Sequence, residues 1–140
     1  MNQIADYVGF QLIQVLKLHR QRAEEGLQAL GLHTGQEMTM LQLWGKDGLT
    51  QSELGQCMGV EPPTVSKMLD RMERSGLIQR RQDLDDARVS RVYLTERGRA
   101  LERPVLDVWR RLEERTVAGL TPAEQLLLRR LVMQLRANLA

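Results

Sequence analysis

Hydrophobic residues recur at helical spacing along the first thirty residues. They follow the i, i+3, i+4 pattern from Ile4 to Leu16, and no proline interrupts them. Tyr7 and Phe10 lie partly outside that stripe, so the apolar surface is too wide for one contact face. The pattern predicts one long helix that ends at Gly31 and is covered on its second side by another subunit.

The end of the chain predicts two further helices. The first begins at Thr95 and is bent locally at Pro104. The second follows the capping box Thr121–Glu124, and its leucines again cover more than one face. We therefore expect residues 1–33 and 99–140 to form a symmetric dimer interface.

Capping boxes also mark short helices in the middle of the chain. Thr34–Glu37 and Thr50–Glu53 each place a threonine hydroxyl at a helix N-cap and a glutamate three residues later. The second box predicts a helix of about two turns that ends at Met58 and turns Leu54 and Cys57 inward.

Pro62 and Pro63 predict the start of the next helix, because the first helical amides have no intrahelical partner. At 100° per residue, its apolar residues fall on one side of the helix, and Gly76 continues their line. The other side carries hydroxyls and three cations. The apolar residues are Val65, Met68, Leu69 and Met72; the opposite side has Pro63, Lys67, Asp70 and Arg74, flanked by Thr64, Ser66 and Arg71. Two helices joined by a short turn indicate a helix-turn-helix.

The periodicity then changes to that of strands. Residues 77–82 and 89–94 are rich in β-branched and aromatic residues, which predicts a hairpin. The loop 83–88 has no glycine, so a two-residue primed turn is excluded and the hairpin has a long charged tip. The predicted fold is mainly α with a small β wing: one winged helix-turn-helix domain over residues 1–140, with residues 34–98 as its core.

Composition excludes several classes of protein. No apolar run approaches the roughly 20 residues of a membrane helix, and the N-terminus lacks a signal-peptide pattern, so we expect a cytoplasmic protein without a membrane partner. A single cysteine excludes an internal disulfide. His19 and His33 are too isolated for a metal site, and we expect no cofactor. Of the 20 basic residues 17 are arginine, which suits phosphate and base-edge contacts.

These motifs together resemble the MarR (multiple-antibiotic-resistance regulator) family of winged helix-turn-helix transcription factors. The resemblance covers essentially the whole chain and includes the family's wing signature, Asp-x-Arg before Leu-Thr-x-x-Gly. The residues that carry it are Leu49–Leu54, Gly59–Val60, Pro63–Lys67, Arg71–Ile78, Asp86–Arg88, Val92–Thr95, Gly98 and Leu120–Pro122.

The resemblance implies a homodimeric regulator of transcription, in most relatives a repressor released by a small aromatic or oxidising ligand. Its partner would be double-stranded DNA with a palindromic operator. The two helix-turn-helix cores of such a dimer bind half-sites about 34–36 Å apart.

Each candidate DNA-binding residue has a chemical role. Hydroxyls and cations of the second helix suit the major groove or its phosphate walls, and residues at the start of the first helix suit a phosphate. By resemblance, Arg88 enters the minor groove, and Asp86 pairs with an arginine to fix the tip. The full set is Gln51, Ser52, Pro63, Thr64, Ser66, Lys67, Arg71, Arg74, Asp86 and Arg88.

The alternative function is a winged helix that binds proteins without reading DNA. An enzyme is rejected, because the sequence holds no nucleophile–base set and no phosphate-binding glycine loop. We expect Cys57 to be a buried, inert thiol. Arg80 and Arg81 serve either phosphate contacts or strand solubility. Trp44, Met38 and Met40 either line an effector cavity or belong to the core.

Overall fold

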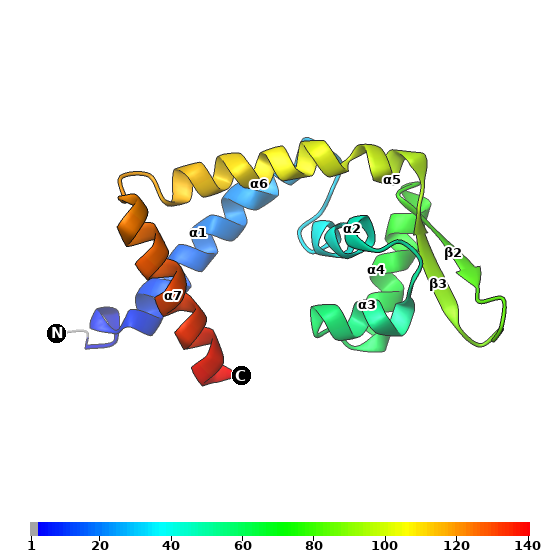
Figure 1. Ribbon diagram of the computed structural model, residues 1–140, viewed down its shortest axis with the longest axis horizontal. Helices are drawn as coiled ribbons and strands as arrows, with labels where there is room; N and C mark the ends of the chain where they lie inside the picture. The colour runs from blue at the N-terminus through cyan, green and yellow to red at the C-terminus, as the bar shows by residue number, and fades with distance from the viewer. Residues whose placement is uncertain (1–2) are drawn as a thin grey trace.

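The computed structural model describes residues 3–140. A winged core lies at one end of the molecule, and helices from both chain ends extend away from it (Figure 1). The elements in order are a 3₁₀ helix η1 (Gln3–Asp6), α1 (Val8–Gln28), α2 (Gln36–Gly45), β1 (Leu49–Thr50), α3 (Gln51–Met58), α4 (Pro62–Arg74), β2 (Ile78–Gln82), β3 (Ser90–Leu94), α5 (Glu96–Ala100), α6 (Glu102–Thr116) and α7 (Pro122–Leu139). None of the helices within these residues is long and apolar enough to cross a membrane.

The N-terminal segment is two helices, so the prediction of a single one is wrong. Tyr7 has an extended backbone (φ −76°, ψ 139°) between η1 and α1. The side-chain amide of Gln11 donates to the Ala5 carbonyl at 2.9 Å. In a continuous helix this carbonyl would accept from a backbone amide instead. The predicted stop at Gly31 is confirmed: its φ is +76°, and Leu32 N donates to Leu27 O at 3.0 Å.

The helix predicted after Thr95 is broken rather than bent. It ends at Ala100 and resumes at Glu102, so α5 and α6 meet at Leu101. Pro104 has no N–H to donate to the carbonyl of Ala100, and its ring crowds that carbonyl. The break therefore falls one turn before the proline.

The three predicted capping boxes have three different outcomes. At α3 the box is complete: Thr50 Oγ1 accepts from Glu53 N at 3.0 Å, and Glu53 Oε2 accepts from Thr50 N at 3.3 Å. At α7, Thr121 Oγ1 accepts from Glu124 N at 3.2 Å, and its hydroxyl bonds the Glu124 carboxylate at 3.0 Å.

The box predicted at Thr34 is wrong. The N-cap of α2 is Gly35, whose φ of +99° favours glycine and moves the helix start one residue along the chain. Glu37 Oε2 accepts from Gly35 N at 2.9 Å, while the buried hydroxyl of Thr34 has no partner among the described residues.

The predicted hairpin is confirmed to within a residue at each end and forms part of a three-stranded antiparallel sheet in the order β1-β3-β2. Ile78 pairs with Leu94 across the hairpin, and Leu49 pairs with Val92 on the other side. Strand β1 was not predicted, because two residues are too few to display an alternating pattern.

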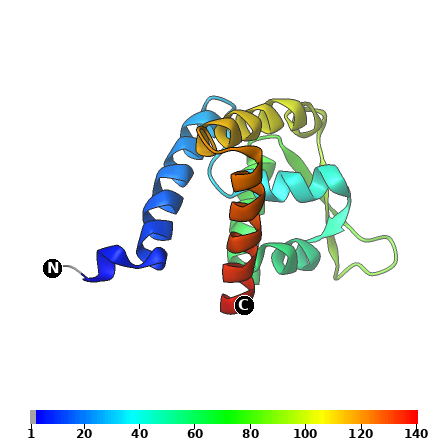
Figure 2. The same cartoon turned by 60° about the vertical axis from the view of Figure 1, so that its left-hand side comes forward.

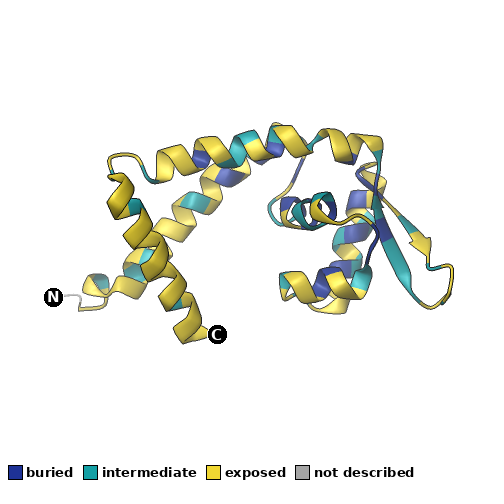
Figure 3. Ribbon diagram, in the orientation of Figure 1, coloured by how far each residue is buried: buried dark blue, intermediate teal, exposed yellow. Residues whose placement is uncertain are grey.

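One hydrophobic core joins the winged elements to the end of α1 and the start of α6 (Figure 3). Leu54, Leu69 and Val92 are fully buried at its centre, and Leu27 of α1 and Val105 of α6 complete it. Met40 is also fully buried and Trp44 packs against the core, so both belong to the core, while Met38 is exposed.

Helices α1 and α6 cross closely at Gly26. A Cβ atom built at this position would lie 2.6 Å from Val108 Cγ1 of α6, which is closer than real contacts allow. Further along the same pair, the His19 and Trp109 rings are 5.8 Å apart. His19 therefore has a packing role.

The ends of the molecule expose most of their apolar side chains. No residue of α7 is buried, and this helix projects from the end of α6 (Figure 2). Large apolar residues are exposed along η1, α1 and α7, and Tyr7 between η1 and α1 is exposed too. The full set is Ile4, Tyr7, Val8, Ile13, Val15, Leu16, Leu18, Leu126, Leu127, Leu128, Leu131, Val132, Met133 and Leu139.

Candidate nucleic-acid interface

The first part of the candidate interface is the N-terminus of α3. The Thr50 capping box starts the helix and leaves Gln51 half-buried and Ser52 exposed in its first turn. Backbone amides in the first turn of a helix have no intrahelical acceptor and carry the positive end of its dipole. This turn is therefore suited to an anionic oxygen.

The prediction that Cys57 faces inward is wrong, because its side chain is exposed. Helix α3 instead turns Leu54 and Gly55 toward the core. A Cβ at Gly55 would lie 3.2 Å from Val60 O and 3.3 Å from Val65 Cγ2, so α3 packs against its neighbour through a glycine. That rotation of the helix turns the thiol outward.

Helix α4 has the two faces that its sequence predicts. Val65, Leu69 and Met72 are buried, and Met68 is half-buried beside them. The opposite face exposes Pro63, Thr64, Lys67, Arg71 and Arg74, with Ser66 half-buried at its edge. An exposed helical face with hydroxyls and cations can contact phosphates and base edges in a major groove.

The tip of the wing holds Arg88 through Asp86. Arg88 Nε and Nη2 donate to the two carboxylate oxygens at 3.1 and 3.2 Å, and Arg88 N also donates to Oδ1 at 3.0 Å. The hydrogen bonds from Arg88 lower the pKa of the Asp86 carboxyl below its ordinary value. The Arg88 side chain is nevertheless 90% exposed, so it is oriented and still free to contact a partner.

The start of the tip loop is fixed by the pair of Asp83 with Arg91 of β3. Asp83 pairs with Arg91 Nε at 2.5 Å, and its other oxygen accepts the backbone amides of Asp85 and Asp86 at 3.1 Å. The hydrogen bond from Arg91 lowers the pKa of Asp83. Arg91 Nη1 also donates to Gly48 O at 2.9 Å, which ties the wing to the segment before β1.

A groove of about 740 Å³ lies between the start of α3, the turn that leads into α4, and the wing. The residues that line it are Thr50, Gln51, Ser52, Gly55, Gln56, Gly59, Val60, Glu61, Pro62, Arg88, Val89 and Ser90. Gln51, Ser52 and Arg88 were predicted from the sequence, and the groove brings all three together. Val89 and Ser90 were missed, because nothing in a strand pattern indicates which face borders a helix.

The cations of α4 do not line this groove. Arg71 and Arg74 border a second hollow of about 390 Å³ together with His33 and the buried Gln36. The candidate interface thus has two parts, a groove beside the wing and the exposed face of α4. Among residues 3–140, no group of three His, Cys, Asp or Glu side chains is placed to hold a metal ion.

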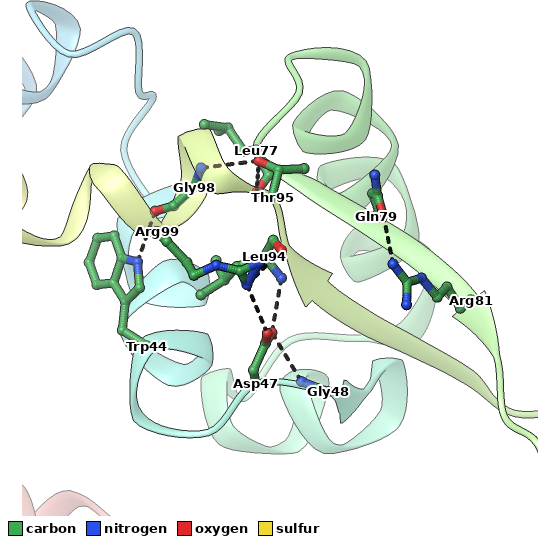
Figure 4. A network of polar contacts seen from close by, with 10 residues as sticks. All are labelled: Trp44, Asp47, Gly48, Leu77, Gln79, Arg81, Leu94, Thr95, Gly98 and Arg99. Carbon is green, nitrogen blue, oxygen red and sulfur yellow. Dashed lines mark hydrogen bonds and ion pairs between the residues drawn. The ribbon is translucent and has the colours of Figure 1, made fainter.

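A polar network joins the wing to the helices that leave the core (Figure 4). Asp47 Oδ1 accepts from Gly48 N and Leu94 N at 3.1 and 2.9 Å, and Oδ2 lies 3.5 Å from Arg99 Nη1. Nearby, Trp44 Nε1 donates to Gly98 O at 2.9 Å. The sheet is therefore bonded to the start of α5, which sets the direction in which α5 and α6 leave it.

The fold and these two surfaces define a winged helix-turn-helix protein. The model of the MarR family matches residues 34–90. The organic hydroperoxide resistance transcriptional regulator of Bacillus subtilis is 33% identical over 82 residues, which is 59% of this chain and 56% of that protein. Three curated relatives, this one among them, are matched over 34%, 56% and 69% of their own length.

Solved structures extend the likeness over almost the whole chain. A MarR-family transcriptional regulator from Silicibacter pomeroyi is 31% identical, with a TM-score of 0.74, over 96% of this chain and 90% of that one. MepR of S. aureus, solved as a complex with DNA, shares the fold at 24% identity and a TM-score of 0.87, over 96% and 98% of the two chains. The chain belongs to the MarR family, whose members are DNA-binding transcriptional regulators and not enzymes.

Proposed function

We propose that the chain is a homodimeric, sequence-specific repressor that binds a palindromic operator and is released by a small-molecule effector. The observation that supports DNA binding is the groove beside the wing, where the first turn of α3 and the oriented Arg88 meet. A phosphate backbone in this groove places α4 in the major groove and the wing tip at the adjacent minor groove.

Within this proposal each predicted residue has one task. Gln51 and Ser52 bind a phosphate at the start of α3. Arg88 enters the minor groove, where a narrow width concentrates negative potential, and Asp86 orients it. The exposed residues of α4, namely Pro63, Thr64, Ser66, Lys67, Arg71 and Arg74, contact bases or phosphates of the major groove.

The dimer rests on the apolar surface of η1, α1 and α7. Single exposed apolar residues are common, whereas contiguous ones mark an interaction surface. Because both ends of the chain carry such a surface, two copies that pack these ends against each other would bury it symmetrically. The two α4 helices then face half-sites one helical turn apart.

The effector proposal is supported by a hollow of about 600 Å³ between α1 and α6. Apolar residues line it together with three arginines and two carboxylates; the charged residues are Arg22, Arg111, Arg115, Glu25 and Asp107. Since the arginines outnumber the carboxylates and apolar side chains lie beside them, the hollow suits a small aromatic anion. A ligand there shifts DNA affinity by its differential binding to two dimer geometries, which amounts to about 1–3 kcal/mol in regulated proteins.

The test is selection of bound duplexes from a random DNA pool, followed by fluorescence anisotropy titrations of the recovered sequence over a range of salt concentrations. We expect a palindrome, two chains per duplex, and a steep fall of affinity with salt, because neutralised phosphates release counterions. Failure to bind any duplex in dilute salt would overturn the proposal in favour of a protein-binding winged helix.

A further inference from the structure

The exposed side of α4 carries two acidic residues among its cations. Asp70 lies in the same helical row as Lys67 and Arg74, and Glu73 lies next to that row. Their side chains are 49% and 40% exposed. A bare carboxylate at this surface would repel a phosphate backbone, since like charges that meet across an interface oppose binding.

Both carboxylates are bound by Arg80 of strand β2. Arg80 Nη2 donates to Asp70 Oδ1 and to Glu73 Oε1, the latter at 3.2 Å, and Arg80 N donates to Glu73 Oε2 at 2.8 Å. Partial burial of the guanidinium lowers its pKa, but the hydrogen bonds with Asp70 and Glu73 outweigh that effect and the net shift is upward. The arginine is therefore a permanent cation at this point.

Arg80 is less exposed than the other two paired arginines of the wing, Arg88 and Arg91. Its side chain is 21% exposed, against 90% for Arg88, and its donors are directed at α4. Arg81, the next residue, lies over the Tyr93 ring at 5.1 Å and bonds Gln79 at 3.0 Å. The two adjacent arginines thus have separate roles, and Arg80 is the one that faces the carboxylates.

We propose that Arg80 is a positioning residue for DNA binding, which neutralises Asp70 and Glu73 so that α4 presents its cations to the phosphates without two opposing charges beside them. This inference rests on the proposed DNA-binding function. It assigns Arg80 neither a phosphate contact nor a role in strand solubility: the residue acts through the two carboxylates.

The test is a thermodynamic cycle of four proteins: wild type, Arg80→Met, Asp70→Asn/Glu73→Gln, and the variant with all three changes. Methionine keeps an apolar stem of similar length and removes the cation. DNA affinity and its salt dependence are measured by anisotropy, while near-UV circular dichroism and thermal unfolding verify that each protein is folded.

We expect Arg80→Met to weaken DNA binding about tenfold or more at low salt, because two carboxylates are unmasked. Removal of both carboxylates in that background is expected to restore affinity to within about threefold of wild type. Loss without rescue, together with a salt slope that falls by about one, would instead identify a direct phosphate contact and overturn the proposal.

The Asp70→Asn/Glu73→Gln protein keeps the test decisive if Arg80→Met fails to fold. Because Arg80 already masks both carboxylates, we expect this protein to bind DNA within about threefold of wild type. A gain of about tenfold would mean that the carboxylates are unmasked in the native protein, and the proposal would be wrong. If wild type itself binds no duplex, the DNA-binding function fails first, and this inference fails with it.

Discussion

The winged core and the terminal helices contain the same kinds of apolar residue but differ in how those residues are covered. In the core, Leu54, Leu69 and Val92 are fully buried within one chain. In α7 no residue is buried, and Leu128 and Leu131 are each 44% exposed. The core therefore buries its apolar surface within one chain, whereas the ends of the molecule leave theirs exposed, and the proposed dimer would cover it.

The largest effect is expected from a charge placed on the exposed apolar surface of α7. We expect Leu128→Asp to make the protein monomeric and to weaken operator binding by about a hundredfold or more, because the two half-sites are no longer bound together. Sedimentation equilibrium and anisotropy measure the two effects. Arg130→Asp, two positions later on the opposite side of α7, is the control and should remain dimeric. A dimeric Leu128→Asp protein would contradict the proposed interface.

Substitution in the core gives a loss of a different kind. Leu69→Ala is expected to lower the free energy of unfolding by about 2–5 kcal/mol through lost burial and a residual cavity. Leu128→Ala should lose stability relative to wild type at concentrations where the proposed dimer forms, and this loss should shrink as both proteins are diluted toward monomers. Urea unfolding at several protein concentrations separates the two. A concentration-independent loss for Leu128→Ala would show that α7 is covered within one chain.

A smaller effect is expected from a substitution at the tip of the wing. Arg88→Ala should reduce DNA affinity by about 1–3 kcal/mol and leave the dimer intact, because the residue is exposed and remote from the terminal helices. Arg110→Ala on α6, also an exposed and paired arginine, is the matched control. Unchanged binding by Arg88→Ala would refute the assignment of the wing tip.

Lys67→Ala should weaken binding by a similar factor on operator and unrelated duplexes and reduce the salt slope by about one, as expected for a phosphate contact. A loss confined to the operator would identify Lys67 as a base-reading residue instead.

The smallest expected effect concerns Glu37, which is buried at the start of α2. Burial raises the pKa of its carboxyl above the ordinary value of 4.5, against hydrogen bonds from backbone amides. Its contribution to stability is therefore complete below the ordinary pKa and is lost as pH rises through the raised one. Glu37→Gln should remove that loss, so thermal unfolding of the variant should change less between acidic and neutral pH. An unchanged pH profile would contradict this expectation.

Sequence patterns predicted the elements that are set by local chemistry. The Thr50 capping box, the prolines that open α4 and the glycine stop at Gly31 each act within a few residues, and each is found as expected. Patterns failed where a contact with a distant segment decides the outcome. Cys57 is exposed because α3 packs through Gly55 on Val65, and the pair between Leu49 and Val92 joins two segments that are distant in the chain.

The candidate site shows the same division. The exposed face of α4 follows from helical spacing alone, and the Asp86–Arg88 pair lies within one short loop. The bonds from Arg80 to Asp70 and Glu73 join a strand to a helix, so no periodicity within either element indicates them. Sequence reasoning accordingly left the role of Arg80 open, and the tertiary fold supplies its partners.

The crossing of α1 and α6 at Gly26 has a consequence for the geometry of the whole assembly. One methyl group there would collide with Val108, whose branched side chain has little rotational freedom. The collision would change the angle at which α1 and α6 cross, and the crossing point lies between the sheet and the far ends of the chain. In the proposed dimer, twofold symmetry would apply the tilt twice, so the absence of a side chain at position 26 would help to set the distance between the two DNA-binding surfaces.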